Sequence, residues 1–330
     1  MAPNTTNPDY RPPQPSGAAA PSLLDVFTVA HPLVDACSFA VLIAGGMTWP
    51  RIIAYNAIAF ALQLPIGLLA DARPEFLRHG YFFGTLLVVV AALGATLGFT
   101  GWTVLAAACI GNALFHLTAG KDVLETHAGR SAPIGLFIST GALGLLAGRL
   151  GMARCAALVL PAFAMALAGT MVWTALRLRK PDIRSLLRTP PLSPSAPLPR
   201  GGTLAAWGLV GLFLLVGWRS WAGLTAGYLS SGQGMTLLLA GAAVTWAGKA
   251  LGGLLARPFG RGPVTALSVC GSAALAFLCP PDWAVAWLGL LFVAQLATGP
   301  VLSLLYDRSG RRGGLAFGLN CLALFLGSLA

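Results

Sequence analysis

The stretch LDVFTVAHPLVDACSFAVLIAGGMT, residues 24–48, is apolar over almost its whole length and holds only three acidic or histidine side chains, those of Asp25, His31 and Asp35. An α-helix rises 1.5 Å per residue, so about 20 apolar residues cross the ~30 Å hydrocarbon core of a bilayer. The stretch therefore predicts a membrane-spanning helix whose middle carries a polar group.

Ten further apolar stretches of comparable length follow along the chain. They lie near residues 52–71, 80–100, 102–119, 132–150, 154–177, 204–227, 233–256, 262–280, 283–306 and 312–330. Of the 330 residues, 56% are hydrophobic and only 9% are charged, whereas a soluble domain carries ~25% charged residues. The same balance excludes an intrinsically disordered chain. We therefore predict an all-α polytopic membrane protein with about 11 transmembrane helices.

The placement of the basic residues accounts for the net charge of +11 without a nucleic-acid partner. Sixteen of the 21 Lys and Arg residues fall in the N-terminal tail and in alternate loops, whereas only Arg51, Arg149 and Arg154 fall in loops on the opposite side. Lys and Arg accumulate in the loops that stay in the cytoplasm. This asymmetry predicts a cytoplasmic N-terminus, and the short basic segments argue against nucleic-acid binding.

The longest loop divides the chain into two halves. We expect a disordered cytoplasmic tail at 1–23, a six-helix bundle at 24–177, a basic, proline-rich cytoplasmic loop at 178–203 and a five-helix bundle at 204–330. The halves repeat: PIGLLADARPEFLRHG at 65–80 resembles LGGLLARPFGRGP at 251–263, and GRSAPIGLF at 129–137 resembles GRRGGLAFG at 310–318. Two pseudo-symmetric bundles of this kind are typical of transporters built from internal repeats.

The first repeated segment resembles a loop motif of the major facilitator superfamily, G-x-x-x-D-R-x-G-R-[RK]. Gly67, Asp71 and Arg78 match the motif in the first half, where Ala72 and Pro74 depart from it. The second copy is matched by Gly253, Arg257, Gly260 and Arg261. The resemblance implies a fold in which the two bundles rock against each other around a central cavity.

Further motifs are similar to those of the fosmidomycin-resistance branch of drug exporters within that superfamily. The matching residues are His31 and Asp35 in helix 1, Gln63, Gly67 and Asp71 in helix 2, Gly111, Phe115 and His116 in helix 4, and Gly135 to Phe137 at the start of helix 5. The superfamily normally has twelve spans, so the chain is expected to lack the twelfth.

Polar residues of helices 1 and 4 predict a proton-coupling site. A carboxylate near the bilayer middle is costly unless it is paired or hydrated, and alternating access lets such a group couple a proton gradient to a substrate. Asp35 is the candidate, with His31 one turn earlier on the same face and with His116, which the resemblance places beside the same cavity. A static His31–Asp35 pair that fixes packing, and a helix-capping role for His116, remain alternatives.

Arg219 is the predicted contact for an anionic substrate. It lies inside the apolar stretch 204–227, and a buried guanidinium binds oxyanions through paired hydrogen bonds. Gln63, Asn112 and Trp218 complete the predicted substrate-binding set. Snorkelling of Arg219 to the outer surface is the alternative, and we expect Lys249 to snorkel toward the cytoplasm.

Charged residues at the cytoplasmic ends predict a gate. In the resembling family such charges hold the two halves together while the inside is closed. The predicted gating residues are Asp71, Arg78, Arg257, Arg261 and Asp307. For the arginines, a solvated face that only sets topology is the alternative.

These features together predict a secondary active transporter, a proton-coupled antiporter that exports a small compound by alternating access, with an anionic compound favoured by Arg219. Proton-coupled uptake of a metabolite and a non-transporting membrane protein derived from the same fold remain alternatives. We expect no enzyme activity, cofactor or metal site, because no nucleotide-binding, hydrolase or zinc-ligand pattern occurs in a suitable context.

The expected partners are protons, a small-molecule substrate and the lipid bilayer, and the expected state is a monomer. Arg outnumbers Lys by 18 to 3 in a chain rich in glycine and alanine, which is typical of GC-rich bacterial genomes. We therefore predict a multi-pass protein of the bacterial plasma (inner) membrane.

Overall fold

The computed structural model describes residues 22–73, 75, 79–179, 203–231, 234–278 and 283–329. All regular elements in these ranges are helical. Nearly all of the predicted tail at 1–23, most of the predicted loop at 178–203 and Arg78 lie outside the described residues.

The helices follow the predicted spans in order. The first half contains α1 (Leu24–Ala44), α2 (Trp49–Asn56), the π-helical segment η1 (Ala57–Ala61), α3 (Gln63–Ala72), α4 (Gly80–Thr96), α5 (Trp102–Thr126), α6 (Ser131–Ser139) and α7 (Gly141–Leu178). The second half contains α9 (Thr203–Ser231), α10 (Met235–Phe259), α11 (Arg261–Leu278), α12 (Ala284–Gln295), α13 (Thr298–Arg308) and α14 (Gly313–Gly327).

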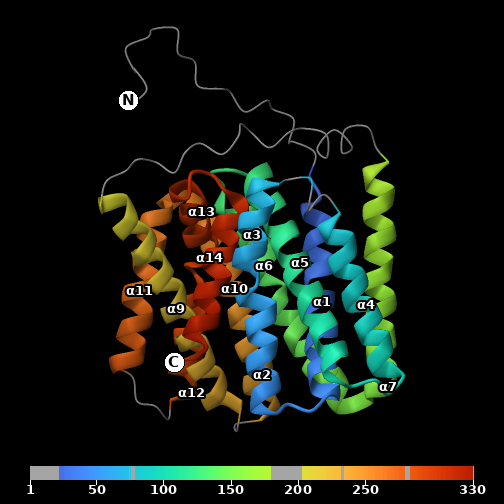
Figure 1. The fold of residues 1–330 in the computed structure, drawn as a ribbon. Helices are drawn as coiled ribbons and strands as arrows, with labels where there is room; N and C mark the ends of the chain where they lie inside the picture. Colours follow the sequence, from blue (N-terminus) through green and yellow to red (C-terminus); the bar gives the residue numbers. More distant parts are fainter. Residues whose placement is uncertain are drawn as a thin grey trace.

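Seven helical stretches of the described chain are long and apolar enough to cross a membrane. One of them, Ser131–Leu178, leaves helical geometry at Cys155. The chain turns back on itself there, because a Cβ on Gly151 would touch the Val159 side chain. This stretch therefore supplies two spans (Figure 1). The shorter helices α4 and α14, together with α9, match the three remaining predicted stretches. The predicted all-α polytopic fold is confirmed.

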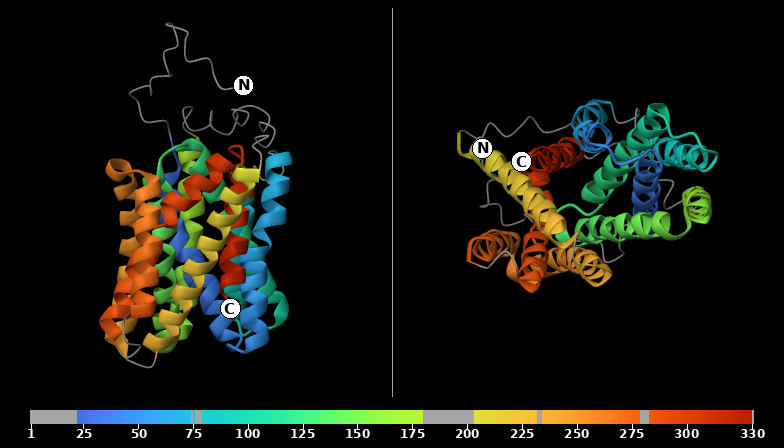
Figure 2. Two further views of the ribbon diagram at one scale, coloured as in Figure 1. Left: turned by 90° about the vertical axis from the view of Figure 1, so that its left-hand side faces the viewer. Right: turned by 90° about the horizontal axis from the view of Figure 1, so that it is seen from below.

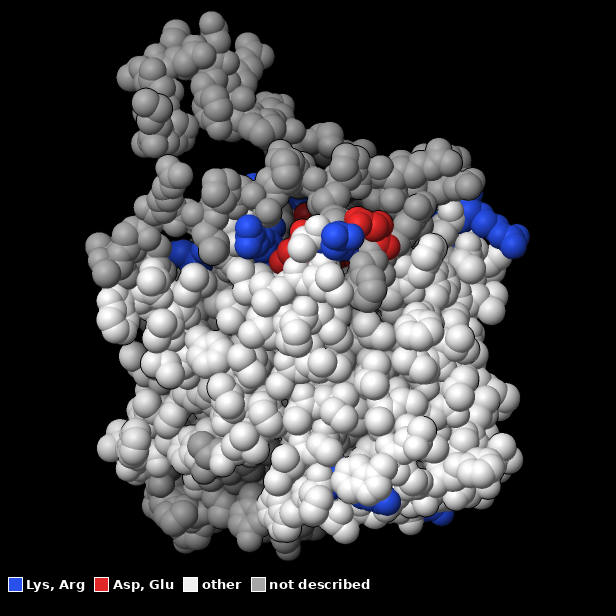
Figure 3. Space-filling view, viewed as in Figure 1, with Lys and Arg blue, Asp and Glu red and all other residues white. Residues whose placement is uncertain are grey.

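The surface also has the character of a protein embedded in lipid. In Figure 3 acidic and basic side chains gather at the upper end of the molecule and basic side chains lie at the lower end, with a broad uncharged belt between them. Helices on the outside of the bundle expose large apolar side chains, such as Leu86 and Val90 of α4 and Leu158, Met165 and Val172 of α7. A belt of this kind is stable in hydrocarbon rather than in water. The chain is a multi-pass membrane protein.

Helix α5 is longer than its apolar stretch. The predicted span ended near residue 119, whereas the helix continues to Thr126. Lys121, Asp122 and Glu125 therefore lie on the last turns of a helix and not in a loop. Hydropathy locates the apolar part of a helix, but the backbone hydrogen bonds of the helix continue through these charged residues.

The two halves contact each other through two equivalent helix pairs. Viewed from below, the helices of residues 22–179 and those of 203–329 form two groups (Figure 2). The groups meet where α3 packs on α14 and where α10 packs on α6. A Cβ on Gly67 of α3 would collide with the backbone of Gly314, and a Cβ on Gly253 of α10 would collide with the backbone of Ser131. Because Gly67 and Gly253 occupy equivalent positions in the repeat, the contacts have the predicted pseudo-symmetry.

Small residues also fix the helix that carries the candidate proton site. A Cβ on Gly144 of α7 would collide with the backbone of Pro32, and one on Gly148 would lie 2.7 Å from the Ala36 carbonyl oxygen. The i, i+4 spacing of these glycines lets α1 and α7 approach closely. The stretch of α1 that contains Asp35 is therefore held against α7 by backbone contact.

Candidate functional site

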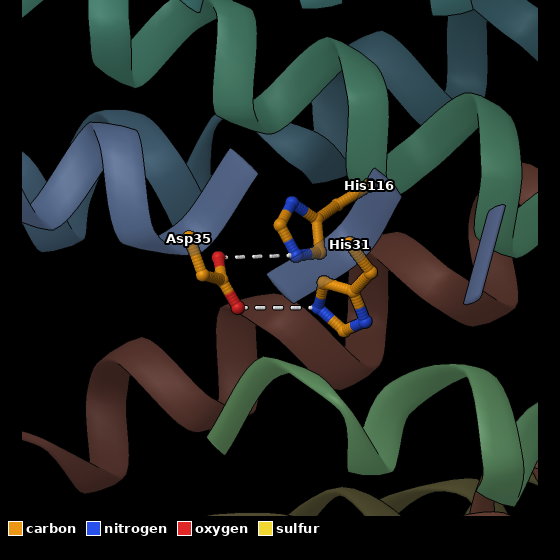
Figure 4. A group of neighbouring side chains, drawn as sticks. All are labelled: His31, Asp35 and His116. Atoms are coloured by element: carbon orange, nitrogen blue, oxygen red, sulfur yellow. Dashed lines mark ion pairs between the residues drawn. The ribbon is translucent and has the colours of Figure 1, made fainter. Parts of the chain in front are cut away.

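Three titratable side chains from two helices meet in the interior of the first half (Figure 4). Nε2 of His31 lies 3.2 Å from Oδ2 of Asp35, and Nε2 of His116 lies 3.5 Å from Oδ1 of the same carboxylate. The three side chains are 4%, 13% and 12% exposed for His31, Asp35 and His116. The structure thus brings together the residues predicted as a proton site.

Hydrogen bonds to backbone carbonyls define the tautomer of both rings. Nδ1 of His31 lies 2.6 Å from the carbonyl oxygen of Phe137, and Nδ1 of His116 lies 2.9 Å from that of Asn112. A carbonyl only accepts hydrogen bonds, so each Nδ1 carries the hydrogen and donates it. In a neutral ring Nε2 then holds a lone pair, and here each Nε2 faces a carboxylate oxygen. Each contact becomes attractive only when a proton or another cation lies between the two atoms.

Neighbouring groups hold the Asp35 carboxylate in place. The Asn112 amide nitrogen donates to Oδ1 of Asp35 at 3.2 Å and also lies 3.4 Å from the Ser38 hydroxyl. On the other side a Cβ on Gly141 would collide with Asp35 Oδ2 and His31 Nε2. Asn112 was predicted as a substrate contact, but in this structure its side chain supports the carboxylate.

Three of the described spans are interrupted, and one of these breaks lies beside the His31 side chain. The break between α6 and α7 at Thr140 follows Phe137, whose carbonyl accepts hydrogen bonds from His31 and from the Thr140 hydroxyl. The break between α12 and α13 falls at residues 296–297, and η1 separates α2 from α3. Broken helices in membrane proteins commonly surround binding sites, because irregular backbone is tolerated there only where its polar groups find partners.

Arg219 lies buried at the second of these breaks. Its side chain is 5% exposed, and Nη1 donates to the Thr298 hydroxyl and, at 3.4 Å, to the Gln295 side-chain oxygen. Within the described part of the chain no carboxylate lies within ion-pair distance of this guanidinium. The snorkelling alternative required an exposed side chain, whereas the Arg219 side chain is buried. Sequence reasoning missed Gln295 and Thr298, although both are polar residues in an apolar stretch.

Lys249 adds a second cation near Arg219. It lies half-buried on α10, and its charge repels that of Arg219 and is attracted by that of Asp35. Its charge also interacts electrostatically with the His116 ring. From the sequence we expected the Lys249 side chain to extend toward the cytoplasm, and this expectation did not place its charge near those of Arg219 and Asp35. The charges of Arg219 and Lys249, both in the second half, therefore interact with each other. Lys249 also interacts with Asp35 and His116 of the first half.

Two further predicted substrate residues have different surroundings. Gln63 is 1% exposed; its amide nitrogen donates to the Ala59 carbonyl of η1 at 2.7 Å, while its Oε1 has no hydrogen-bond partner among the described residues. Trp218 instead donates its Nε1 hydrogen to the Ser272 hydroxyl at 3.0 Å and packs against Trp221. Gln63 therefore retains a buried free acceptor, whereas the polar atom of Trp218 is used within the second half.

Asp71 joins the two halves at the end of α3. Its carboxylate accepts hydrogen bonds from the backbone amides of Gly314 at 2.9 Å and Leu315 at 2.7 Å, in the first turn of α14. Lys121 lies 3.0 Å from the same carboxylate and also pairs with Glu125. A negative charge is favourable at a helix N-terminus. Sequence reasoning did not include Lys121 in the gate.

Among the other predicted gating residues, those within the described ranges do not form such a link. Arg261 pairs with Asp307 at 2.6 Å, but both residues belong to the second half, so this ion pair joins α11 to α13. Arg257 is exposed, and Arg78 lies outside the described residues. Of the predicted gating residues that the structure describes, Asp71 is the one with hydrogen bonds across the two halves.

Comparisons with known proteins identify the class of this fold. No family model matches the sequence, and no curated protein matches it. Among solved structures, the human organic anion transporter MFSD10 aligns with a TM-score of 0.66 and 14% identity, over 93% of this chain and 92% of that one. The proton:xylose symporter XylE aligns at 0.61 and 13%, over 93% and 86%, and FucP in its outward conformation at 0.60 and 14%, over 93% and 87%. The chain has the fold of the major facilitator superfamily transporters.

Proposed function

We propose that this protein is a secondary active transporter that couples the movement of protons to that of a small organic anion. The observation that carries the proposal is the geometry of His31, Asp35 and His116, in which two Nε2 atoms face one buried carboxylate and each contact needs a cation to be attractive. Such a cluster binds and releases protons as its access to water changes.

The anionic character of the substrate is inferred from Arg219 and Lys249. A buried guanidinium that has only neutral partners gains free energy from an oxyanion, which forms charge-assisted hydrogen bonds with it. Lys249 adds a second positive charge. The proposal is consistent with the names of similar structures, since MFSD10 is an organic anion transporter and FucP and XylE are proton symporters.

The charge arrangement favours binding of the proton and the anion together. When Asp35 is ionised it attracts Lys249, and when it is protonated that attraction ends and Lys249 is left for the substrate. Protonation also makes the cluster more positive, which strengthens binding of an anion. The second candidate is export by exchange against protons, which is the direction predicted from the resemblance to fosmidomycin-resistance exporters. Exchange requires that binding of the proton favours release of the anion.

Flux measurements in liposomes distinguish these candidates. The purified protein is reconstituted with a pH-sensitive dye inside, and carboxylates and phosphonates are added outside. If the inward anion gradient drives protons inward, the proton and the anion move in the same direction, which supports the proposal. If it drives protons outward, the result supports exchange. A folded protein that moves no proton with any of these anions contradicts the proposal and favours the non-transporting alternative.

Arg219→Gln is expected to weaken substrate affinity. Loss of charge-assisted hydrogen bonds to a buried anion costs about 1.5–3 kcal/mol, which corresponds to a roughly 10- to 150-fold rise in KM. Arg219→Lys keeps the charge and should give a smaller rise. Arg177→Gln serves as the control, because Arg177 forms a partly exposed ion pair with Asp25. An unchanged KM in Arg219→Gln would remove this residue from the binding site.

The proposed setting follows from the sequence. We place the protein in the plasma membrane of a bacterium with its N-terminus in the cytoplasm, because most Lys and Arg residues fall on that side. We also propose that the monomer is the active unit, since residues of both halves of one chain supply the candidate groups.

A further inference from the structure

We propose that His31, Asp35 and His116 form a binding site for a divalent first-row transition-metal ion such as Zn²⁺. Each residue offers one ligand atom, and these atoms all lie within 4.8 Å of one another. Zinc bonds of about 2.0–2.2 Å in a tetrahedral site put neighbouring ligand atoms roughly 3.3 Å apart. Here Nε2 of His31 lies 3.2 Å from one oxygen of Asp35 and Nε2 of His116 lies 3.5 Å from the other, and these distances lie on either side of that value.

The surrounding hydrogen bonds orient the ligands as in a metal site. A histidine that binds a metal through one nitrogen usually donates its other N–H to a carbonyl or carboxylate, which fixes the tautomer and the ring orientation. The carbonyl groups of Phe137 and Asn112 accept from Nδ1 of His31 and His116 respectively, and both Nε2 atoms are left to face Asp35. The Asn112 side chain steadies the carboxylate.

The cluster also needs a cation on electrostatic grounds. An ion between the three groups would accept both Nε2 lone pairs and balance the Asp35 charge without any added proton. Two imidazoles and a carboxylate suit Zn²⁺ and similar ions, whereas Mg²⁺ and Ca²⁺ prefer oxygen ligands. Gly141 keeps the adjacent space free, since a Cβ there would collide with Asp35 and His31. Lys249, whose charge reaches the cluster, opposes the ion.

Metal binding can be tested without transport, with Co²⁺ as the spectroscopic probe. The full chain in detergent, stripped with a chelator, is titrated with Co²⁺ while the visible absorption of the bound ion is recorded. We expect one Co²⁺ per chain, displaced by Zn²⁺, and a loss of at least about tenfold in affinity in His116→Gln and Asp35→Asn. His116→Cys should retain binding because a thiolate is also a ligand.

His127→Gln is the matched control, because His127 lies at the end of the same helix as His116 and its Nδ1 donates to the Val123 carbonyl, away from Asp35. It should bind Co²⁺ as the wild type does. If His116→Gln fails to fold, the same site is tested by thermal unfolding. Zn²⁺ should raise the unfolding temperature of the wild type, and this rise should be lost in Gly141→Ala. No metal spectrum from the folded wild type, or equal affinity in wild type and His116→Gln, overturns the proposal.

The outcome is independent of the proposed transport. Proton flux measured in the presence of a chelator, together with no Co²⁺ binding, would reject the metal site and leave the transporter standing. Co²⁺ binding without flux for any anion would do the reverse. If the protein both binds Co²⁺ and moves protons, Zn²⁺ should inhibit proton flux in the wild type, because the ion occupies the atoms that bind the proton.

Discussion

Asp35→Asn is expected to abolish substrate-driven proton movement, reducing it to the level of protein-free liposomes. The amide is nearly the same size as the carboxyl group but does not bind a proton at physiological pH. The two Nε2 atoms of His31 and His116 then lose the acid that they share. The measurement is the dye-reported pH change inside liposomes after addition of the anion.

Asp25→Asn is the matched control for this variant. Asp25 lies on the same helix, but its side chain is 44% exposed and pairs with Arg177 at 3.2 Å. It should leave the proton flux unchanged. If Asp35 only fixes helix packing, Asp35→Asn would lower the unfolding temperature and leave the proton-to-substrate ratio as in the wild type. That result would contradict the coupling role.

Gly67→Ala is expected to slow transport strongly by disfavouring closure of the two halves. A Cβ at this position would collide with the backbone of Gly314, which has no flexible side chain to move away. Overpacking of this kind costs about 1–3 kcal/mol, enough to lower the ratio of the closed to the open arrangement by a factor of roughly 5 to 150. The amides of Gly314 and Leu315 would also move away from Asp71.

Thiol labelling measures this closure. The Ser131 hydroxyl is buried and donates across the two halves to Ser303 at 3.1 Å, so a cysteine at position 131 is protected while they are together. Labelling at this position should be at least about fivefold faster in Gly67→Ala. Gly94→Ala is the control, because the nearest atom to its Cβ would be Val104 Cγ2 at 3.9 Å. Equal labelling rates in the two variants would show that the α3–α14 contact does not control closure.

Much of the fold could be predicted from the sequence because hydropathy is a local property. Each of the eleven apolar stretches coincides with helical structure, and the repeated glycines mark the helices that join the halves. The end of α5 was placed too early, because the charged residues Lys121 and Glu125 end the apolar stretch but not the hydrogen-bonded helix.

The candidate site was predictable only in part. The pair His31 and Asp35 follows from i, i+4 spacing on one helix, whereas His116 enters 81 positions after Asp35 and no spacing rule connects them. The same separation explains why the proposed metal site was not expected from the sequence: the residues proposed as its ligands do not form a sequence motif. Arg261 and Asp307 were predicted to act in the gate; they pair with each other within the second half, and their gating role stays a prediction.

The sequence by itself determined that this chain spans a membrane many times, in two related halves, with acidic, histidine and arginine side chains inside apolar helices. These properties depend on composition and on short-range periodicity. Only the tertiary structure decided which nitrogen of each histidine faces Asp35, that Arg219 has neutral partners, and that Asp71 bonds the first turn of α14. Those facts depend on contacts between helices far apart in the chain, and such contacts are selected by packing rather than by local pattern.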